Sequence, residues 1–337
     1  MKWIRIVLGL DASNSDYCCF LCTCYFKKKT DFKNGYKINR TLKEANRCYC
    51  EKKKEERMGY VRKPIIDFID FMRVMFDTLH LFIRISEQLI WILMAKINEK
   101  DATNSMDLEH RPNLKIFKTF LEEKCKIQNP LVFNTKDKTI KLRKKINAGQ
   151  TKKIFECFYA LDENDMDENV HTINEKANKS SLQKVFPKLN LLVENKVFGR
   201  FLTLYGYMVN YSKMPLDLGA YNEELKLWLE AYLKLNQKED DKKELTPYIH
   251  IFVFHTSEIL AVHGNIHLFN TQGLEKFNDV VKQYYRRSTN KRNDKDGGEN
   301  FVGQIMNCVN RNEIEKFGVT IREIEHKIIR DERRRYD

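Results

Sequence analysis

Residues 64–97 read PIIDFIDFMRVMFDTLHLFIRISEQLIWILMAKI and carry the strongest structural signal in the chain. Apolar residues recur here at intervals of three and four, which places their side chains on one face of an α-helix. Pro64 suits the first turn of a helix, where the missing N–H is not needed. The pattern therefore predicts one long amphipathic helix beginning at Pro64. Its apolar face would comprise Ile66, Ile69, Met72, Phe76, Leu79, Phe82, Ile83, Leu89 and Leu93.

The composition extends this prediction to the rest of the chain. The 337 residues are 42% apolar and 12% aromatic, and only 13 Gly and 6 Pro interrupt regular structure. Strand-like alternation is nearly absent, so we expect a mainly α-helical bundle with a large core. No membrane span is expected, because the long stretch holds too many charges for a bilayer interior: Asp67, Asp70, Arg73, Asp77, Arg84 and Glu87.

Shifts in composition divide the chain into five segments. We expect an N-terminal segment with a CxxC pair (1–26), a basic excursion (27–63), a helical bundle (64–245), helices that carry a His pair and Glu275 (246–290), and a basic C-terminal tail or helix (291–337). Further helices are expected over 114–125, 151–161, 181–213, 222–235, 271–287 and 310–335, with a short hairpin or loop over 129–142. Thr246 and Pro247 form a good cap and first turn for another helix.

Charge and cysteine usage indicate the cellular setting. The formal net charge of +13 favours a polyanionic partner such as DNA. Nine cysteines, an odd number clustered near the N-terminus, resemble reduced thiols more than a disulfide framework. No secretory signal is recognised, so a nuclear or cytoplasmic location is expected.

Two residue pairs have the spacing of zinc ligands. Cys19 and Cys22 form a CxxC pair, and His250 and His255 form an HxxxxH pair, each supplying half of a tetrahedral site. Cys48 and Cys50 could instead complete a local four-cysteine site, and both pairs could also be ordinary core residues. Five positions along a regular helix turn the second imidazole about 140° away from the first, so the helix has to tighten, bulge or end between the two His residues.

Other residues have functional and structural interpretations of comparable weight. Asp77 and His80 lie three apart and are expected to share a helix face as a carboxylate–imidazole pair that supports the fold. Glu275 is either a metal-binding carboxylate or an acid in the first turn of a helix. A basic cluster next to Tyr284 and Tyr285 could contact DNA or be merely solvated; it comprises Arg286, Arg287, Lys291 and Arg292.

Taken in order, these motifs resemble the C-terminal part of the catalytic core of DDE transposases of the Transib-like lineage, which includes the large subunit of the V(D)J recombinase. The similarity is carried by short motifs between residues 9 and 278: Gly9-Leu10-Asp11-Ala12-Ser13, Cys19-x-x-Cys22, Asp77-Thr78-Leu79-His80, Tyr248-Ile249-His250 through His255, Gly264-Asn265-Ile266 and Gly273-x-Glu275.

The resemblance implies one split zinc site of Cys19, Cys22, His250 and His255 in a helical insertion of an RNase H-like core, most of whose sheet is missing. It also implies Glu275 as the third catalytic carboxylate, with Mg²⁺ bound only if two further acids are supplied. Those acids precede Gly9 in the family. We therefore expect a transposase-derived, truncated protein that binds zinc and DNA, is inactive alone and can form a homodimer. The alternatives are a C-terminal fragment of an active transposase and a metal-free helical scaffold.

Overall fold

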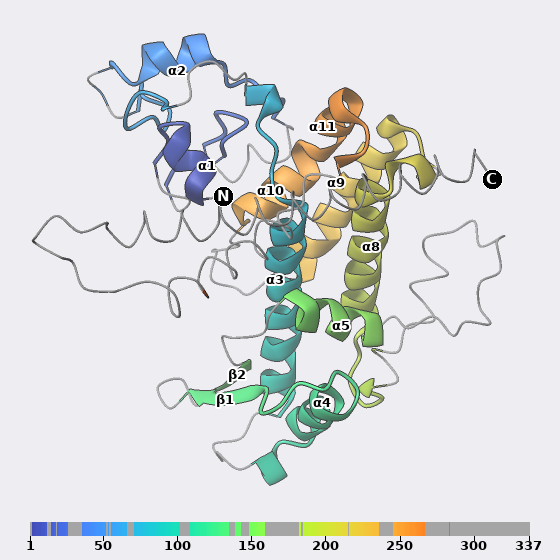
Figure 1. The fold of residues 1–337 in the computed structure, drawn as a ribbon. Coiled ribbons are helices and arrows are strands. Elements are labelled where there is room, and N and C mark those ends of the chain that lie inside the picture. The colour runs from blue at the N-terminus through green and yellow to red at the C-terminus, as the bar shows by residue number, and fades with distance from the viewer. Residues whose placement is uncertain are drawn as a thin grey trace, which may run out of the picture. The chain divides into compact units, whose positions relative to one another are not determined.

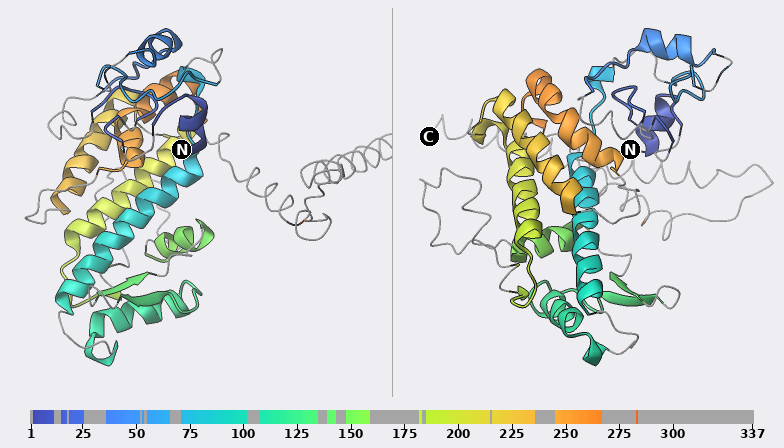
Figure 2. Two further views of the ribbon diagram at one scale, coloured as in Figure 1. Left: turned by 90° about the vertical axis from the view of Figure 1, so that its left-hand side faces the viewer. Right: turned by 180° about the vertical axis from the view of Figure 1, so that it is seen from behind.

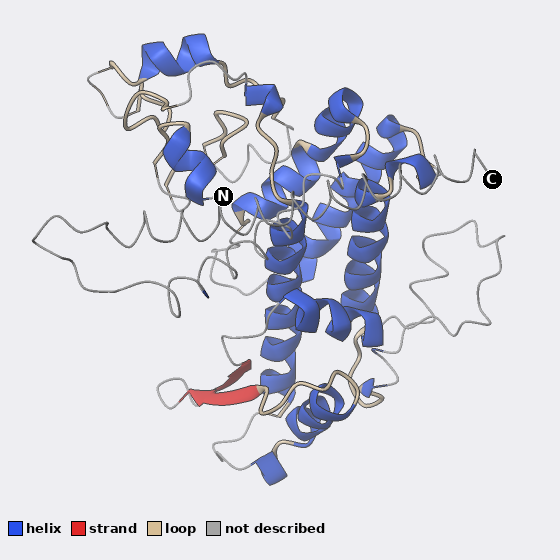
Figure 3. Ribbon diagram, viewed as in Figure 1, coloured by secondary structure: helices blue, strands red, loops and turns tan. Residues whose placement is uncertain are grey.

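A computed structural model shows a mainly helical protein (Figures 1 and 3). It describes residues 2–11, 15–17, 19–25, 36–51, 53, 55–65, 71–101, 108–134, 139–142, 148–158, 182, 185–214, 216–235, 245–266 and 283. The chain divides into two compact units, Met1–Asn270 and Thr271–Asp337. Because only residue 283 of the second unit is described, everything that follows concerns the first. The helices expected over 271–287 and 310–335 lie outside the described residues.

The predicted fold class is confirmed. The helices are α1 (Lys2–Val7), α2 (Leu42–Cys48), α3 (Thr78–Lys100), α4 (Pro112–Glu123), α5 (Ala148–Phe158), α8 (Leu192–Val209), α9 (Leu218–Leu235), α10 (Pro247–Phe254) and α11 (Thr256–His263), with short 3-10 turns at Phe71–Arg73, Leu108–His110 and Tyr211–Lys213. Within the described residues, the sheet consists of two antiparallel strands, β1 (Leu131–Asn134) and β2 (Thr139–Leu142), so the hairpin expected over 129–142 is present. Helices α4, α5 and α9 each match a predicted helix to within a few residues. Helix α8 covers residues 192–209 of the longer helix predicted over 181–213.

The long helix begins later than predicted. Instead of starting at Pro64, α3 starts at Thr78, where Asp77 caps it by accepting a hydrogen bond from the Leu79 amide at 3.1 Å. Residues 64–65 belong to the N-terminal part of the fold, since the Ile65 amide donates to the Val7 carbonyl at 2.8 Å. The start at Pro64 was predicted from apolar spacing, which continues across residues 64–77 and gives no sign of a boundary. The boundary is set by Asp77, which caps the first amides of a helix that starts at Thr78.

Within α3 the apolar spacing predicted the buried face in part: Phe82, Leu89 and Leu93 are buried, whereas Leu79 and Ile83 are half-buried. Ten residues of α3 are buried. The helix runs antiparallel to α8. The Tyr205 hydroxyl, near the end of α8, donates to the Thr78 carbonyl at the start of α3 at 3.3 Å, and Lys96, near the end of α3, binds Asn190 and Glu194 at the beginning of α8. Figure 2 shows the two helices side by side in both views. By length and apolar character alone α3 could cross a membrane, although half of that stretch is buried inside the protein and core helices pass the same test.

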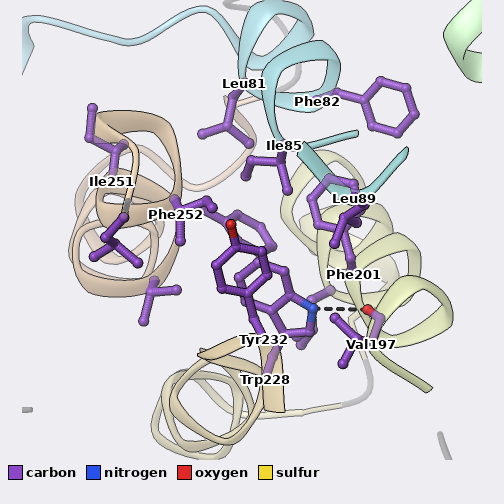
Figure 4. Packing of buried hydrophobic residues seen from close by; sticks show 14 of the residues in the cluster. Leu81, Phe82, Ile85, Leu89, Val197, Phe201, Trp228, Tyr232, Ile251 and Phe252 are labelled. Carbon is purple, nitrogen blue, oxygen red and sulfur yellow. Dashed lines mark hydrogen bonds between the residues drawn. The ribbon is translucent and has the colours of Figure 1, made fainter. Parts of the chain in front are cut away.

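Aromatic side chains fill the space between α3, α8, α9 and α10 (Figure 4). Trp228 of α9 is fully buried, with ring centroids 5.9 Å from Phe201 of α8 and 5.5 Å from Phe252 of α10. Its indole N–H donates to the Val197 carbonyl at 2.9 Å, so its one polar atom is satisfied. This packing fixes α10, the helix that presents His250, against the rest of the bundle.

Candidate metal centre

The first half of the centre is an irregular segment held by one buried arginine. Residues 19–25 contain no helix or strand, so their backbone groups need partners from elsewhere. Arg40 supplies them: its Nε donates to the carbonyls of Cys19 at 3.1 Å and Cys22 at 2.9 Å, while its guanidinium lies 4.9 Å from the centre of the Tyr60 ring. The Leu21 amide also approaches the Cys19 Sγ at 3.4 Å. The turn that carries both thiols is therefore held in place by the surrounding protein.

The second half is built at a break between two helices. Thr246 caps α10 by accepting from the Ile249 amide at 3.3 Å, and Pro247 occupies its first turn, as predicted. Helix α10 ends at Phe254 and α11 begins at Thr256, with His255 between them at φ −118° and ψ −15°. This break turns the His255 ring back toward His250, so that the two Nε2 atoms are 3.1 Å apart. The helix was expected to tighten, bulge or end between the two His residues, and the structure shows that it ends.

The two halves meet, although more than two hundred residues separate them in the sequence. The Cys22 Sγ lies 3.2 Å from the His250 Nε2, and the Cys19 Sγ lies 3.5 Å from the His255 Nε2. All four candidate ligand atoms fall within 4.8 Å of one another, and all four side chains are fully buried. Zn–S bonds of about 2.3 Å and Zn–N bonds of about 2.0 Å at tetrahedral angles give ligand separations of about 3.3 to 3.8 Å. The group has the donors and nearly the dimensions of a closed metal site.

Glu258 extends the centre by one residue. Its Oε2 lies 3.5 Å from the Nδ1 of His255 and accepts a hydrogen bond from the Ile38 amide at 2.9 Å. The Nε2 of His255 is thereby left facing the thiols, the arrangement in which a carboxylate orients an imidazole ligand. Glu258 also links α11 to the segment between the CxxC turn and α2.

The pKa values of these side chains are shifted by burial and by their contacts with one another. Burial raises the pKa of the Cys22 thiol to about 12, despite an opposing hydrogen bond from Cys19. Burial lowers the pKa of His250. For His255, burial acts in the same direction, but hydrogen bonds with Cys19 and Glu258 outweigh it and raise the pKa to about 9. Because a metal binds thiolate and neutral imidazole, occupation of the site has to displace these protons.

The alternative four-cysteine site is not formed. Cys48 is buried at the end of α2, and Cys50 is exposed, with its thiol directed to the Asn46 carbonyl. Among the described residues, the group with metal-ligand geometry is Cys19, Cys22, His250 and His255.

Asp77 and His80 are in contact, as expected, but not as neighbours on one helix face. Asp77 lies before α3 as its N-cap, and its carboxylate binds the Leu79 amide and the Nδ1 of His80 together. The pair fixes the start of α3, which supports the structural interpretation. Burial, followed by the charge of Asp77, raises the pKa of the adjacent Tyr205 to about 12.

Sequence reasoning missed two residues of the centre. Glu258 follows His255 by three positions, a spacing that could have indicated contact across one helical turn. Arg40 has no such signal, because it belongs to a run of basic residues that resembles a solvated surface. Glu275 and the proposed DNA-contacting residues Arg286, Arg287, Lys291 and Arg292 lie outside the described residues.

In comparisons with known proteins, no family model matches the sequence and no curated protein is significantly similar to it. Fold and site together define a mainly helical protein with a buried Cys₂His₂ group that could hold a metal ion such as zinc.

Proposed function

We propose that the protein binds one structural Zn²⁺ ion through Cys19, Cys22, His250 and His255. The observation that carries the proposal is the meeting of two half-sites, from opposite parts of the described chain, in one buried group. Two thiolates and two imidazoles are the preferred donors of Zn²⁺, and a site with four protein ligands leaves no position for a substrate. The ion would join the N-terminal segment to the α10–α11 junction.

We further propose that the zinc-stabilised fold serves DNA binding in a protein of transposase ancestry. The motif order described above and the net charge of +13 support this proposal. Strand cleavage by two Mg²⁺ ions needs several carboxylates around one site, and Glu275 is the one candidate that the resemblance assigns to this sequence. We therefore propose DNA binding as the function that the residues of this sequence provide.

Metal content and DNA binding test the two statements separately. Mass spectrometry of the purified protein is expected to find one zinc per chain, and the double variant His250→Ala, His255→Ala is expected to contain none. Electrophoretic mobility shifts with random-sequence duplex DNA are expected for the wild-type protein. Zinc retained in the double variant would refute the metal site, and absence of any DNA complex at low salt would refute DNA binding.

Glu258→Gln is expected to weaken zinc binding without abolishing it. The amide keeps the size of the side chain but lacks the charge that orients and polarises His255. Loss of such a partner lowers metal affinity by about 10- to 100-fold. Competition with a chromophoric chelator measures this shift, and Glu230→Gln, at an exposed position of α9, is the control. An affinity equal to that of the wild type would show that Glu258 has no role in positioning His255.

A further inference from the structure

Two cysteines outside the candidate metal centre lie where helices α4 and α5 end. Cys125 directly follows Lys124, the C-cap of α4, and Cys157 is in the last turn of α5. Both are free thiols, and neither belongs to the Cys₂His₂ group. They form a second set of thiols, to which the metal centre gives no role.

Aromatic packing holds the ends of the two helices together. The ring of Phe158, the neighbour of Cys157 in the sequence, stacks on Phe120 of α4, with ring centroids 4.9 Å apart and planes 3° apart. The same ring lies 6.5 Å from Phe117, one turn earlier on α4. All three phenylalanines are buried. The burial of these rings therefore fixes the end of α5 against the end of α4, independently of the cysteines.

Within this packing, the thiol of Cys157 reaches the chain at Cys125. It donates a hydrogen bond to the Lys124 carbonyl, with the sulfur 3.8 Å from the oxygen. The carbon of that carbonyl is bonded to the nitrogen of Cys125. The Cys125 amide in turn donates to the Phe120 carbonyl at 3.2 Å, so α4 holds this backbone in place. A disulfide needs Cα atoms about 4.4 to 6.8 Å apart, which restricts it to residues that are neighbours in space, as these two are.

The two thiols differ in their access to solvent. Cys125 is 2% exposed, whereas Cys157 is half-buried. Burial, followed by the charge and the hydrogen bond of Cys157, raises the pKa of the Cys125 thiol to about 12. Oxidation of a cysteine by a small molecule needs an accessible thiolate. Cys157 is therefore the thiol that an oxidant in solution reaches, and Cys125 lies behind it.

We propose that Cys125 and Cys157 form a peroxide-responsive modification site, at which oxidation closes an intramolecular disulfide. The Cys157 sulfur attacks one oxygen of hydrogen peroxide, the O–O bond breaks, and the thiol proton leaves with the other oxygen as water, which gives a sulfenic acid. The Cys125 sulfur then attacks the sulfenic sulfur. The S–S bond forms, and the hydroxyl leaves with the Cys125 proton as a second water. The two cysteines lose two electrons in total, and the peroxide takes up both.

The disulfide would tie the end of α4 to the end of α5. The loop that it closes, residues 125–157, includes the β1–β2 hairpin. A cross-link of this kind restricts the unfolded chain, so oxidation is expected to make the protein more resistant to urea. A thiol reductant would reverse the change, as expected of a transient, regulatory disulfide. The proposal requires neither the bound zinc ion nor DNA.

The test is peptide mapping of the purified protein under non-reducing conditions, by mass spectrometry, after treatment with hydrogen peroxide. The wild-type protein is expected to lose the mass of two hydrogen atoms and to yield one cross-linked peptide that contains Cys125 and Cys157. Dithiothreitol is expected to restore the free thiols. Cys50→Ser, which removes an exposed thiol that contacts the Asn46 carbonyl, is the control and is expected to form the same cross-link.

Two single variants test the order of the reaction. Cys125→Ser is expected to stop at the sulfenic acid of Cys157, which dimedone captures, and its urea midpoint should not rise with peroxide as that of the wild type does. Cys157→Ser is expected to leave the buried Cys125 unmodified. Initial capture of a sulfenic acid on Cys125 in this variant would contradict the assigned roles.

The wild-type protein alone decides whether the site exists, so the result does not depend on the folding of a variant. A stable sulfenic acid on Cys157 without a cross-link would show that the two thiols do not meet and would overturn the proposal. A disulfide between Cys157 and any other cysteine would do the same. Release of zinc while Cys125 and Cys157 stay reduced would place the peroxide-sensitive thiols in the metal centre instead.

Discussion

Replacing Cys22 by serine is expected to release the zinc ion and to lower the free energy of unfolding by several kcal/mol. A hydroxyl is a much weaker zinc ligand than a thiolate, and a structural zinc contributes its binding energy directly to folding. Since the Cys22 Sγ lies 3.2 Å from the His250 Nε2, the substitution opens one edge of the buried group. Denaturant unfolding with parallel zinc analysis measures both effects, and His255→Ala is expected to behave in the same way.

Cys50→Ser is the matched control for this prediction. Cys50 is also a free thiol of the N-terminal region, but it is exposed and lies outside the candidate centre. Its substitution should leave zinc content and stability unchanged. Zinc lost from Cys50→Ser but retained by His255→Ala would restore the local four-cysteine site and contradict the structure.

Trp228→Ala is expected to destabilise the bundle by about 3 to 5 kcal/mol, the usual cost of emptying a large aromatic site in a core. The indole is fully buried, contacts Phe201, Tyr232 and Phe252, and donates to the Val197 carbonyl. Removing it leaves a cavity at the junction of α8, α9 and α10.

Trp91→Ala makes the same chemical change at an exposed position. The Trp91 side chain is 64% exposed on α3, so its removal is expected to change the free energy of unfolding by less than about 0.5 kcal/mol. Urea denaturation of both variants provides the comparison. Similar losses from the two substitutions would mean that Trp228 does not occupy the core position described here.

The amino-acid sequence by itself determined the mainly helical class, the helical conformation of residues 78–97, the capped start of α10 and the residue types of both half-sites. These features depend on local physics: apolar periodicity, the need of the first amides of a helix for a cap, and the ligand preference of zinc. The requirement that the helix tighten, bulge or end between His250 and His255 also followed from local geometry, and the structure shows that it ends.

Tertiary structure alone decided which half-sites meet. Spacing offered Cys19 and Cys22 two sets of partners, and the choice of His250 and His255 over Cys48 and Cys50 depends on packing between segments more than two hundred residues apart. The role of Arg40 was decided in the same way, because the carbonyls that it binds belong to a distant turn and leave no mark on the local pattern. The start of α3 at Thr78, in contrast, follows from a local cap, Asp77, which the apolar spacing on both sides of it concealed. Local sequence can specify a ligand, but contacts across the fold select the site that it completes.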